Sequence, residues 1–425
     1  MPTLLPLLTT LALPESLSLQ GYAELRGSYS PVEQGTPWTA AERLRPTLEW
    51  QPTARLGLTL TAEARASQGR YLPDEALLLL DKALAAETGL SLDEIEELTG
   101  CAITAVPRTE DWRDFIGLER AFVDLERPRY DLRLGRQAVA WGSALVFNPT
   151  DVFSDVNVAE PWRERPGVDA ARLLIPIGEE AQVALVGGVD DLPGTLRDRP
   201  EITPWKVGGR ATLHAAATDW SLVAVTGGER LDAEASFIGL DLKGDLGLGW
   251  WLEGGYDGDL RAAAGLDYSF PVAQSLYLAA QAYHDGSGSD PEDYGSKALS
   301  GEMFETEGCE DLPPNAPIAS LTAPAAEARA TQGRWYGTLV ARLAANDRWG
   351  LSASGLVNLA DGSILVTPYA TFTPMGRLSA NLGLNGMTGA HGELNPDPRD
   401  LQVQGVDASG LLAPWTALAW LRLSL

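Results

Sequence analysis

The feature that most constrains the fold is an alternation of apolar and polar residues that recurs through nearly the whole sequence. Residues 56–65 are an example, reading Leu-Gly-Leu-Thr-Leu-Thr-Ala-Glu-Ala-Arg. A period of two is typical of β-strands with one apolar and one polar face. About eighteen segments carry the pattern, which is the spacing expected of a large all-β chain. The segments lie near 17–26, 43–50, 55–65, 118–126, 129–137, 168–175, 181–188, 206–214, 218–226, 230–242, 246–257, 259–269, 275–284, 335–345, 348–358, 363–372, 376–385 and 413–425.

The connections between these segments tend to alternate between short and long. Short ones such as 51–53 and 215–217 take turns with mostly longer ones, although a few of the second set are also tight. The four longest loops are 66–117, 138–167, 285–334 and 386–412. Strands of about ten residues, with turns at one end and loops at the other, are typical of membrane-spanning barrels. We therefore predict a single transmembrane antiparallel up-and-down β-barrel over residues 17–425, with about eighteen strands and sixteen as the alternative.

The competing fold is a soluble all-β sandwich or propeller. The division of Leu and Ala onto one face and Arg, Glu and Thr onto the other argues against it, because so many long strands share it. Trp50, Trp250 and Trp335 also fall near strand ends on the apolar face, as an aromatic girdle at a membrane interface requires. The last alternation, 413–425, resembles the final strand of outer-membrane barrels, although Leu425 stands where Phe or Trp is usual.

The first sixteen residues are expected to be the remnant of an export signal. Residues 4–13 read LLPLLTTLAL, which has the length of a signal-peptide core, but no Lys or Arg precedes them. An ordinary N-terminal extension is the alternative for residues 1–16.

The formal net charge of −26 excludes nucleic-acid binding as a function, because that needs a basic surface. Acidic residues gather in 285–312, a pattern typical of a solvated loop. The two cysteines, Cys101 and Cys309, lack metal-site spacing. A long-range disulfide and two separate thiols both remain open at this point.

If the Leu/Ala face meets lipid, the alternate face lines a lumen. That face carries many arginines and several acids, so it predicts a water-filled channel rather than a dry core. The expected partners are outer-membrane lipid and lipopolysaccharide on the outside and a small hydrophilic solute inside. Homo-oligomerisation is left open.

The loop at 138–167 is apolar in its first half and charged in its second. General porins resemble this arrangement, with a long third loop that folds inward and narrows the barrel. By that resemblance, loop acids facing wall arginines would create a transverse field across the constriction. The predicted pore-wall and constriction residues are Arg43, Arg45, Arg65, Arg120, Asp131, Arg133, Arg136, Trp141, Asp151, Asp155, Glu160, Arg163 and Arg165.

The stretch 135–151 carries a further resemblance. Gly135-Arg136-Gln137, then Trp141-Gly142 and Asn148-Pro149, is similar to a Gly-Arg-Gln…Trp-Gly…Asn-Pro signature of poorly characterised long outer-membrane barrels of Gram-negative bacteria. The resemblance covers about forty residues and implies a cell outer-membrane location more than a substrate. Barrels of the alginate-export type are a more distant comparison. For Trp141 and Asn148-Pro149, packing against the wall is favoured over direct solute contact.

Signals for catalysis are weak. His214, His284 and His391 are far apart, and none has metal-site spacing, so we expect no cofactor, no metal and no enzyme activity. The string 285–293 resembles a calcium loop without its full spacing. The leading hypothesis is a channel for passive diffusion of small hydrophilic solutes. The alternatives are a substrate-specific or export channel for an anion or acidic polysaccharide, a structural or adhesive barrel, and an outer-membrane hydrolase.

Overall fold

The computed structural model of the chain describes the barrel wall and much of its loops. The described residues are 16–31, 37–70, 77, 81–82, 85, 89–105, 115–153, 164–189, 205–228, 235–293, 304–307, 331–396, 402–403, 406–407 and 413–424. No helix among them is long and apolar enough to cross a membrane.

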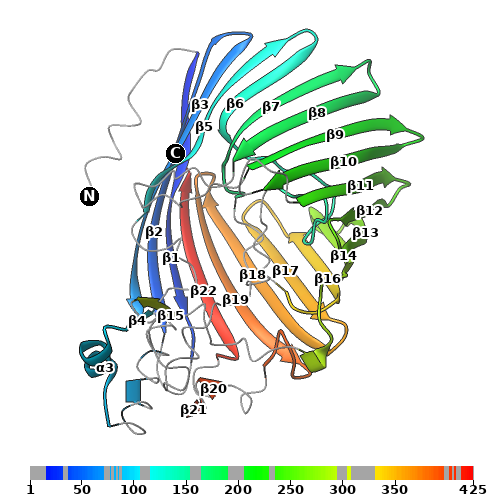
Figure 1. Cartoon of the computed structure of the whole chain (residues 1–425). Coiled ribbons are helices and arrows are strands. Elements are labelled where there is room, and N and C mark those ends of the chain that lie inside the picture. Colours follow the sequence, from blue (N-terminus) through cyan, green and yellow to red (C-terminus); the bar gives the residue numbers. More distant parts are fainter. Residues whose placement is uncertain are drawn as a thin grey trace.

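Eighteen strands form one sheet that closes on itself (Figure 1). Each strand pairs antiparallel with the next in the chain, and β1 pairs with β22 to close the barrel, with Glu24 opposite Arg422. The predicted fold class and strand number are therefore confirmed, and the sixteen-strand alternative is excluded. The strands of the wall are β1 (Leu17–Tyr29), β2 (Trp38–Thr53), β3 (Leu56–Arg70), β5 (Phe115–Arg127), β6 (Tyr130–Gln137), β7 (Val168–Ile177), β8 (Ala181–Val189), β9 (Trp205–Ala215), β10 (Thr218–Gly228), β11 (Ala235–Asp245), β12 (Gly249–Tyr256), β13 (Leu260–Phe270), β14 (Ser275–Asp285), β16 (Trp335–Ala344), β17 (Trp349–Asn358), β18 (Ser363–Met375), β19 (Leu378–Gly389) and β22 (Trp415–Ser424).

The alternation places large apolar side chains on the outside of the wall. Leu222 on β10 and Ile238 on β11 are each 64% exposed, whereas the next residue along, Val223, is 2% exposed. Exposed Leu residues in this period recur around the barrel, as a lipid-facing surface requires. The chain thus presents to its surroundings the face that the sequence pattern assigned to lipid.

The inner face divides into two sectors, and the sequence pattern predicted only one of them. On β1 to β7 it carries charged side chains, as expected. On β8 to β17 many inward side chains are apolar and buried, such as Val223, Phe237 and Val340. The prediction of a polar wall is therefore wrong at these positions, because the loop between β6 and β7 packs against them and excludes water, although Glu253 and Gln281 are polar inward residues of the same strands.

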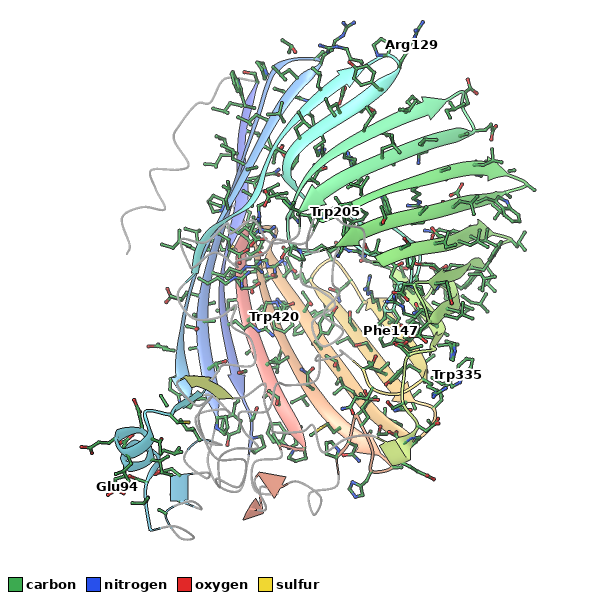
Figure 2. All side chains as sticks on the ribbon, viewed as in Figure 1. Glu94, Arg129, Phe147, Trp205, Trp335 and Trp420 are labelled. Atoms are coloured by element: carbon green, nitrogen blue, oxygen red, sulfur yellow. The ribbon has the colours of Figure 1, made fainter. Side chains whose placement is uncertain are left out.

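The long connections share one end of the barrel, which we call the loop end; the other is the turn end. Glu94, on a loop-end helix, and Arg129, in the β5–β6 turn, mark the two ends (Figure 2). Outside the wall lie α3 (Leu92–Thr99), β4 (Ala102–Ala105), η2 (Pro291–Asp293), β15 (Phe304–Glu307), β20 (Gln402–Val403) and β21 (Val406–Asp407). Strands β3, β5 and β19 run a few residues into the predicted loops 66–117 and 386–412, because backbone pairing with the neighbouring strands continues beyond the alternating segments.

Two loop-end segments that are far apart in sequence are joined. Strand β4 pairs antiparallel with β15, so that Ala102 lies opposite Glu307. The neighbouring Cys101 is buried and disulfide-bonded. The sequence contains one other cysteine, Cys309, which lies outside the described residues. Its pairing with Cys101 stays a prediction, and the β4–β15 pairing by itself joins the β3–β5 loop to the β14–β16 loop.

Candidate functional site

The loop between β6 and β7 lies inside the barrel, as predicted, over its described parts, 138–153 and 164–167. Its outgoing limb packs against two apolar patches of the inner wall. Val139, Trp141 and Phe153 join one cluster, with the Trp141 and Phe153 rings meeting edge to face at 4.8 Å. Val146 and Phe147 join a second cluster on β13 to β17. The limb thus covers these apolar patches, and the charged side chains of β1 to β7 lie outside them.

Two wall side chains fix the backbone of this limb. The buried carboxylate of Glu253 on β12 accepts hydrogen bonds from the amides of Ser143 (3.1 Å), Ala144 (3.0 Å) and Thr150 (2.7 Å), and from the Thr150 hydroxyl (2.6 Å). Gln281 on β14 accepts from the amides of residues 145 and 146 and donates to the carbonyl of residue 147. A buried carboxylate is tolerated only when its acceptor positions are filled, and the loop amides fill those of Glu253.

The structure explains why particular residue types occur at several signature positions within 135–149. Gly135 has a φ of 115°, and a Cβ there would overlap the carbonyl of Ala121 on the next strand. Gln137 is buried and donates to the Ala170 carbonyl at 2.9 Å. Gly142 has a φ of 86°, and a Cβ there would overlap the side chain of Asn148. These residues therefore turn the chain from the strand into the lumen and fold the loop onto itself.

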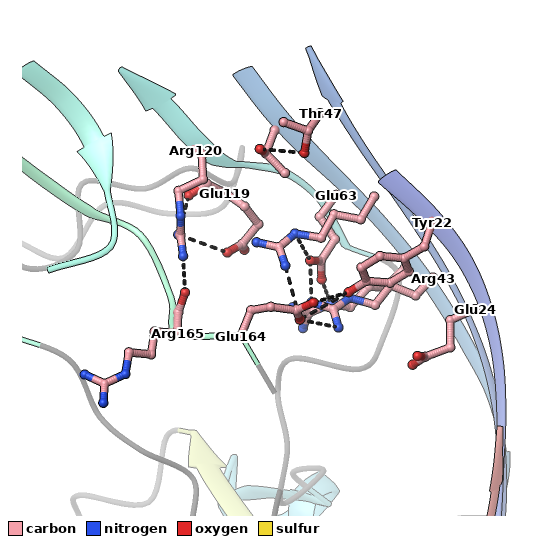
Figure 3. Close-up of polar contacts among 12 residues, drawn as sticks. Tyr22, Glu24, Arg43, Thr47, Glu63, Glu119, Arg120, Glu164 and Arg165 are labelled. Carbon is pink, nitrogen blue, oxygen red and sulfur yellow. Dashed lines mark hydrogen bonds and ion pairs between the residues drawn. The ribbon is translucent and has the colours of Figure 1, made fainter. Parts of the chain in front are cut away.

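The returning limb crosses to the charged sector (Figure 3). The Glu164 carboxylate accepts a hydrogen bond from the Tyr22 hydroxyl at 3.0 Å. It also pairs with the guanidinium groups of Arg43 (3.3 Å) and Arg45 (3.1 Å) on β2. A loop acid thus contacts wall arginines directly instead of facing them across open water. The contact fixes the far side of the loop in the lumen.

Four wall arginines surround this contact, and we call them, with Glu63, the arginine cluster: Arg43, Arg45, Arg65 and Arg120. Glu63 on β3 is fully buried and pairs with Arg43 at 2.6 Å, with Arg45 at 3.5 Å and with Arg65. The period of two brings these residues to one face, because Arg43 lies opposite Arg65 in the β2–β3 register. Three guanidinium groups thus contact one buried carboxyl group, as burial of an acid requires.

Arg120 joins the arginine cluster through a β-bulge. Thr61 lies opposite Arg120 and Ala62 opposite Leu118, so Glu119 is the extra residue. Arg120 donates to the backbone carbonyls of Glu119 (2.8 Å) and Arg165, and its nearest carboxylate, that of Glu119, is 4.0 Å away. Its charge is therefore the least neutralised in the arginine cluster.

The other predicted site residues lie elsewhere. Arg136 pairs with Asp169 at 2.8 Å beside the arginine cluster. Arg133 is nearer the turn end, bound through two nitrogens to Asp124, with Asp131 close to the β5–β6 turn. Trp141 is 4% exposed in the loop core, and Asp151 is buried and paired with Arg165. Asp155, Glu160 and Arg163 fall outside the described residues.

Several residues of this site were not among the predicted site residues. Glu253, Glu63 and Glu164 could be recognised as inward or loop acids from the alternation alone. Nothing in the pattern distinguishes these three acids from the other inward residues. The period of two predicts which side of the wall a side chain lies on, but not which loop atoms the side chain contacts. Gln281 is uncharged, so the search for charged inward residues does not include it.

The weaker sequence signals have local explanations. The ring of His284 stacks on Trp335 at 4.3 Å near the loop end of the wall, and His214 contacts Asp219 at 2.7 Å beside the β9–β10 turn. Asp285 accepts hydrogen bonds from Ser287 within its own turn. Over the described part of the chain, no group of three or more His, Cys, Asp or Glu side chains is arranged to hold a metal ion.

A closed eighteen-strand barrel with an apolar outer face and an inward loop has the fold of the Gram-negative outer-membrane β-barrels. No protein-family model matches the sequence, and no curated protein matches it either. Solved outer-membrane proteins share the fold. Pseudomonas aeruginosa OccK2, solved with glucuronate, is 12% identical, with 98% of this chain and 99% of that one covered at a TM-score of 0.50. Acinetobacter baumannii OccAB1 is 10% identical, with 96% of each chain covered, and Pseudomonas aeruginosa OccK5 is 9% identical, with 96% and 98% covered, both at 0.50.

Proposed function

We propose that the protein is an outer-membrane channel for passive diffusion of small hydrophilic solutes, narrowed by the loop 138–167. The observation that carries this proposal is the course of that loop. It covers the apolar sector of the inner wall and its returning limb contacts the arginine cluster at Glu164. A solute crossing the barrel would therefore pass along the charged sector of β1 to β7.

The charge of that sector favours anions, which is the alternative that the sequence left open. Among the described residues, the guanidinium groups of Arg43, Arg45, Arg65 and Arg120 gather on this part of the wall around the carboxylates of Glu63, Glu164 and Glu119, which concentrates cations there. Side-chain charge at a constriction sets ion preference. OccK2, which shares the fold, was solved in complex with glucuronate, a carboxylated sugar. We therefore propose a preference for small anionic solutes, with the lipid-facing exterior holding the channel in the membrane.

Swelling of proteoliposomes tests this function. Vesicles holding the folded protein are expected to swell in isotonic neutral sugars, and faster in a sugar acid of matched size. Refolding is verified by the heat-dependent shift in gel mobility that folded barrels show. Swelling no faster than that of protein-free vesicles would contradict a diffusion channel. Equal rates for the neutral and acidic sugars would contradict the anion preference alone.

The Glu164 contact makes a prediction about pH. Burial opposes ionisation of this side chain, but Arg45 and Arg43 outweigh burial, so the pKa of Glu164 lies below its ordinary value of 4.5. A carboxyl whose pKa is lowered in the folded protein contributes stability above its ordinary pKa and loses it as the pH falls through the folded pKa. We expect the anion preference to stay constant from pH 7 down to the ordinary pKa value of 4.5 and to rise below it, because Arg43 and Arg45 then keep only Glu63 as a charged partner. Reversal potentials across a pH series measure this, and Glu164→Gln should have the acid-pH preference already at pH 7.

A further inference from the structure

A loop-end segment, residues 390–396 after β19, folds back onto the ends of β16, β17 and β18. The Glu393 amide donates to Asp361 at 2.9 Å, and the Leu394 amide donates to the Ser363 hydroxyl at 3.0 Å. Both acceptors belong to the β17–β18 connection or to the residue that follows it. The segment is therefore attached to the wall by its backbone as well as by its side chains.

The carboxylate of Glu393 is held entirely by neutral donors. It accepts hydrogen bonds from the Asn358 amide group at 2.8 Å and from the Gly333 amide at 3.2 Å. It also accepts from the Gln332 amide and the Tyr336 hydroxyl. Hydrogen bonds to a charged acceptor are stronger than those between neutral groups. Four of them on one side chain make this the strongest attachment of the segment.

Tyr336 connects this attachment to the loop 138–167. The side chain is fully buried, and its ring lies 5.5 Å from the ring of Phe147. Phe147 belongs to residues 145–148 of the outgoing limb, which we call the tip. Phe147 in turn stacks on Tyr283 at 4.4 Å with an interplanar angle of 11°. Leu394 packs against the same cluster. Tyr336 thus contacts the segment 390–396 through its hydroxyl and the tip of the inward loop through its ring. Phe147 and Trp335 are labelled in this region in Figure 2.

We propose that Glu393 and Tyr336 are positioning residues for the constriction, so that the loop-end segment 390–396 holds the tip of loop 138–167 in place. The proposal rests on the proposed function, because it assigns a role to a constriction. Glu253 fixes residues on either side of the tip from the wall, whereas Glu393 acts on the tip itself from the open end of the barrel, through Tyr336.

Loss of the tip contact should differ from loss of the whole loop. The amides of Leu145 and Val146 keep Gln281 as their acceptor, so the limb returns to the wall after each opening. The ring of Phe147 would keep its stacking on Tyr283 but lose a fixed neighbour. Local opening of the tip then becomes more frequent without a change in the barrel. Channel currents should become noisier, with short excursions to higher conductance, while the main conductance level is unchanged.

Hydrogen exchange read out by mass spectrometry tests the proposal without relying on conduction. The variants are Tyr336→Phe, which keeps the ring and removes the hydroxyl, Glu393→Gln and the double change. Glu292→Gln, an exposed acid of η2, is the matched control for loss of one negative charge. Amides of residues 145–150 should exchange about tenfold faster in each single variant, the size expected for one lost hydrogen bond to a charged group. The double variant should add little, because both changes break the same link.

Peptides from β1 and β2 should exchange at the wild-type rate in all variants, which separates a local role from general destabilisation. Wild-type exchange of 145–150 in folded Tyr336→Phe would overturn the proposal, whatever the behaviour of Glu393→Gln. Faster exchange in Glu292→Gln as well would also overturn it. Failure of the channel function itself would appear instead as absent conductance with the exchange differences intact.

Discussion

Replacing Glu253 with alanine is expected to release the outgoing limb of loop 138–167 from the wall and to raise the open-channel conductance severalfold. The carboxylate accepts four hydrogen bonds from three loop residues, Ser143, Ala144 and Thr150. A hydrogen bond to a charged group contributes about 1.5–3 kcal/mol, so their joint loss outweighs what remains of the docking at this point. The amides left behind favour leaving the wall, because a buried unpaired donor costs about 1–3 kcal/mol.

Single-channel recording in planar bilayers measures this effect. Glu126→Gln, at the exposed end of β5, is the matched control for loss of a negative charge and should leave the conductance unchanged. Glu253→Gln should give an intermediate result, since it keeps one acceptor oxygen. A wild-type conductance in folded Glu253→Ala would show that the loop does not limit the current.

The double substitution Arg45→Gln and Arg120→Gln is expected to abolish the anion preference. It removes two cations while the two buried or loop acids keep partners, because Glu63 keeps Arg43 and Arg65, and Glu164 keeps Arg43 and Tyr22. Glu119 loses only its long contact with Arg120, at 4.0 Å. Two unit charges 4 Å apart interact by about 1 kcal/mol in water. Each lost guanidinium should therefore change the anion-to-cation permeability ratio roughly fivefold.

The reversal potential under a salt gradient gives that ratio. The double substitution Arg348→Gln and Arg377→Gln is the matched control. Both arginines are exposed in turn-end connections, and replacing them removes the same amount of charge. The control pair should leave the reversal potential close to that of the wild type. An equal shift in both double variants would mean that overall charge, rather than the arginine cluster, sets the preference.

The wall could be predicted from the sequence because each strand meets two different environments. Lipid outside requires residues such as Leu222 and Ile238, whereas the inner residues next to them face protein or water. This contrast produces the period of two, and closure follows because an open sheet edge in lipid would leave backbone groups unpaired. The period of two also predicts that the arginines share the inner face, as Arg43 and Arg65 do on neighbouring strands.

The arrangement inside the lumen could not be predicted, because it depends on contacts between residues far apart in sequence. Val223 and Phe237 look like interruptions of a polar face until the loop that covers them is placed. Glu253 and Glu63 have the same sequence signal, yet one holds a loop and the other pairs with arginines. The link from Glu393 through Tyr336 to Phe147 joins three segments of the chain, and no local pattern records it.

The most direct test is the zero-current potential of the wild-type protein in a planar bilayer between unequal KCl concentrations. Our account predicts an open channel whose zero-current potential has the sign of chloride preference. Folded protein that conducts no current, or a zero-current potential with the sign of potassium preference, would contradict it.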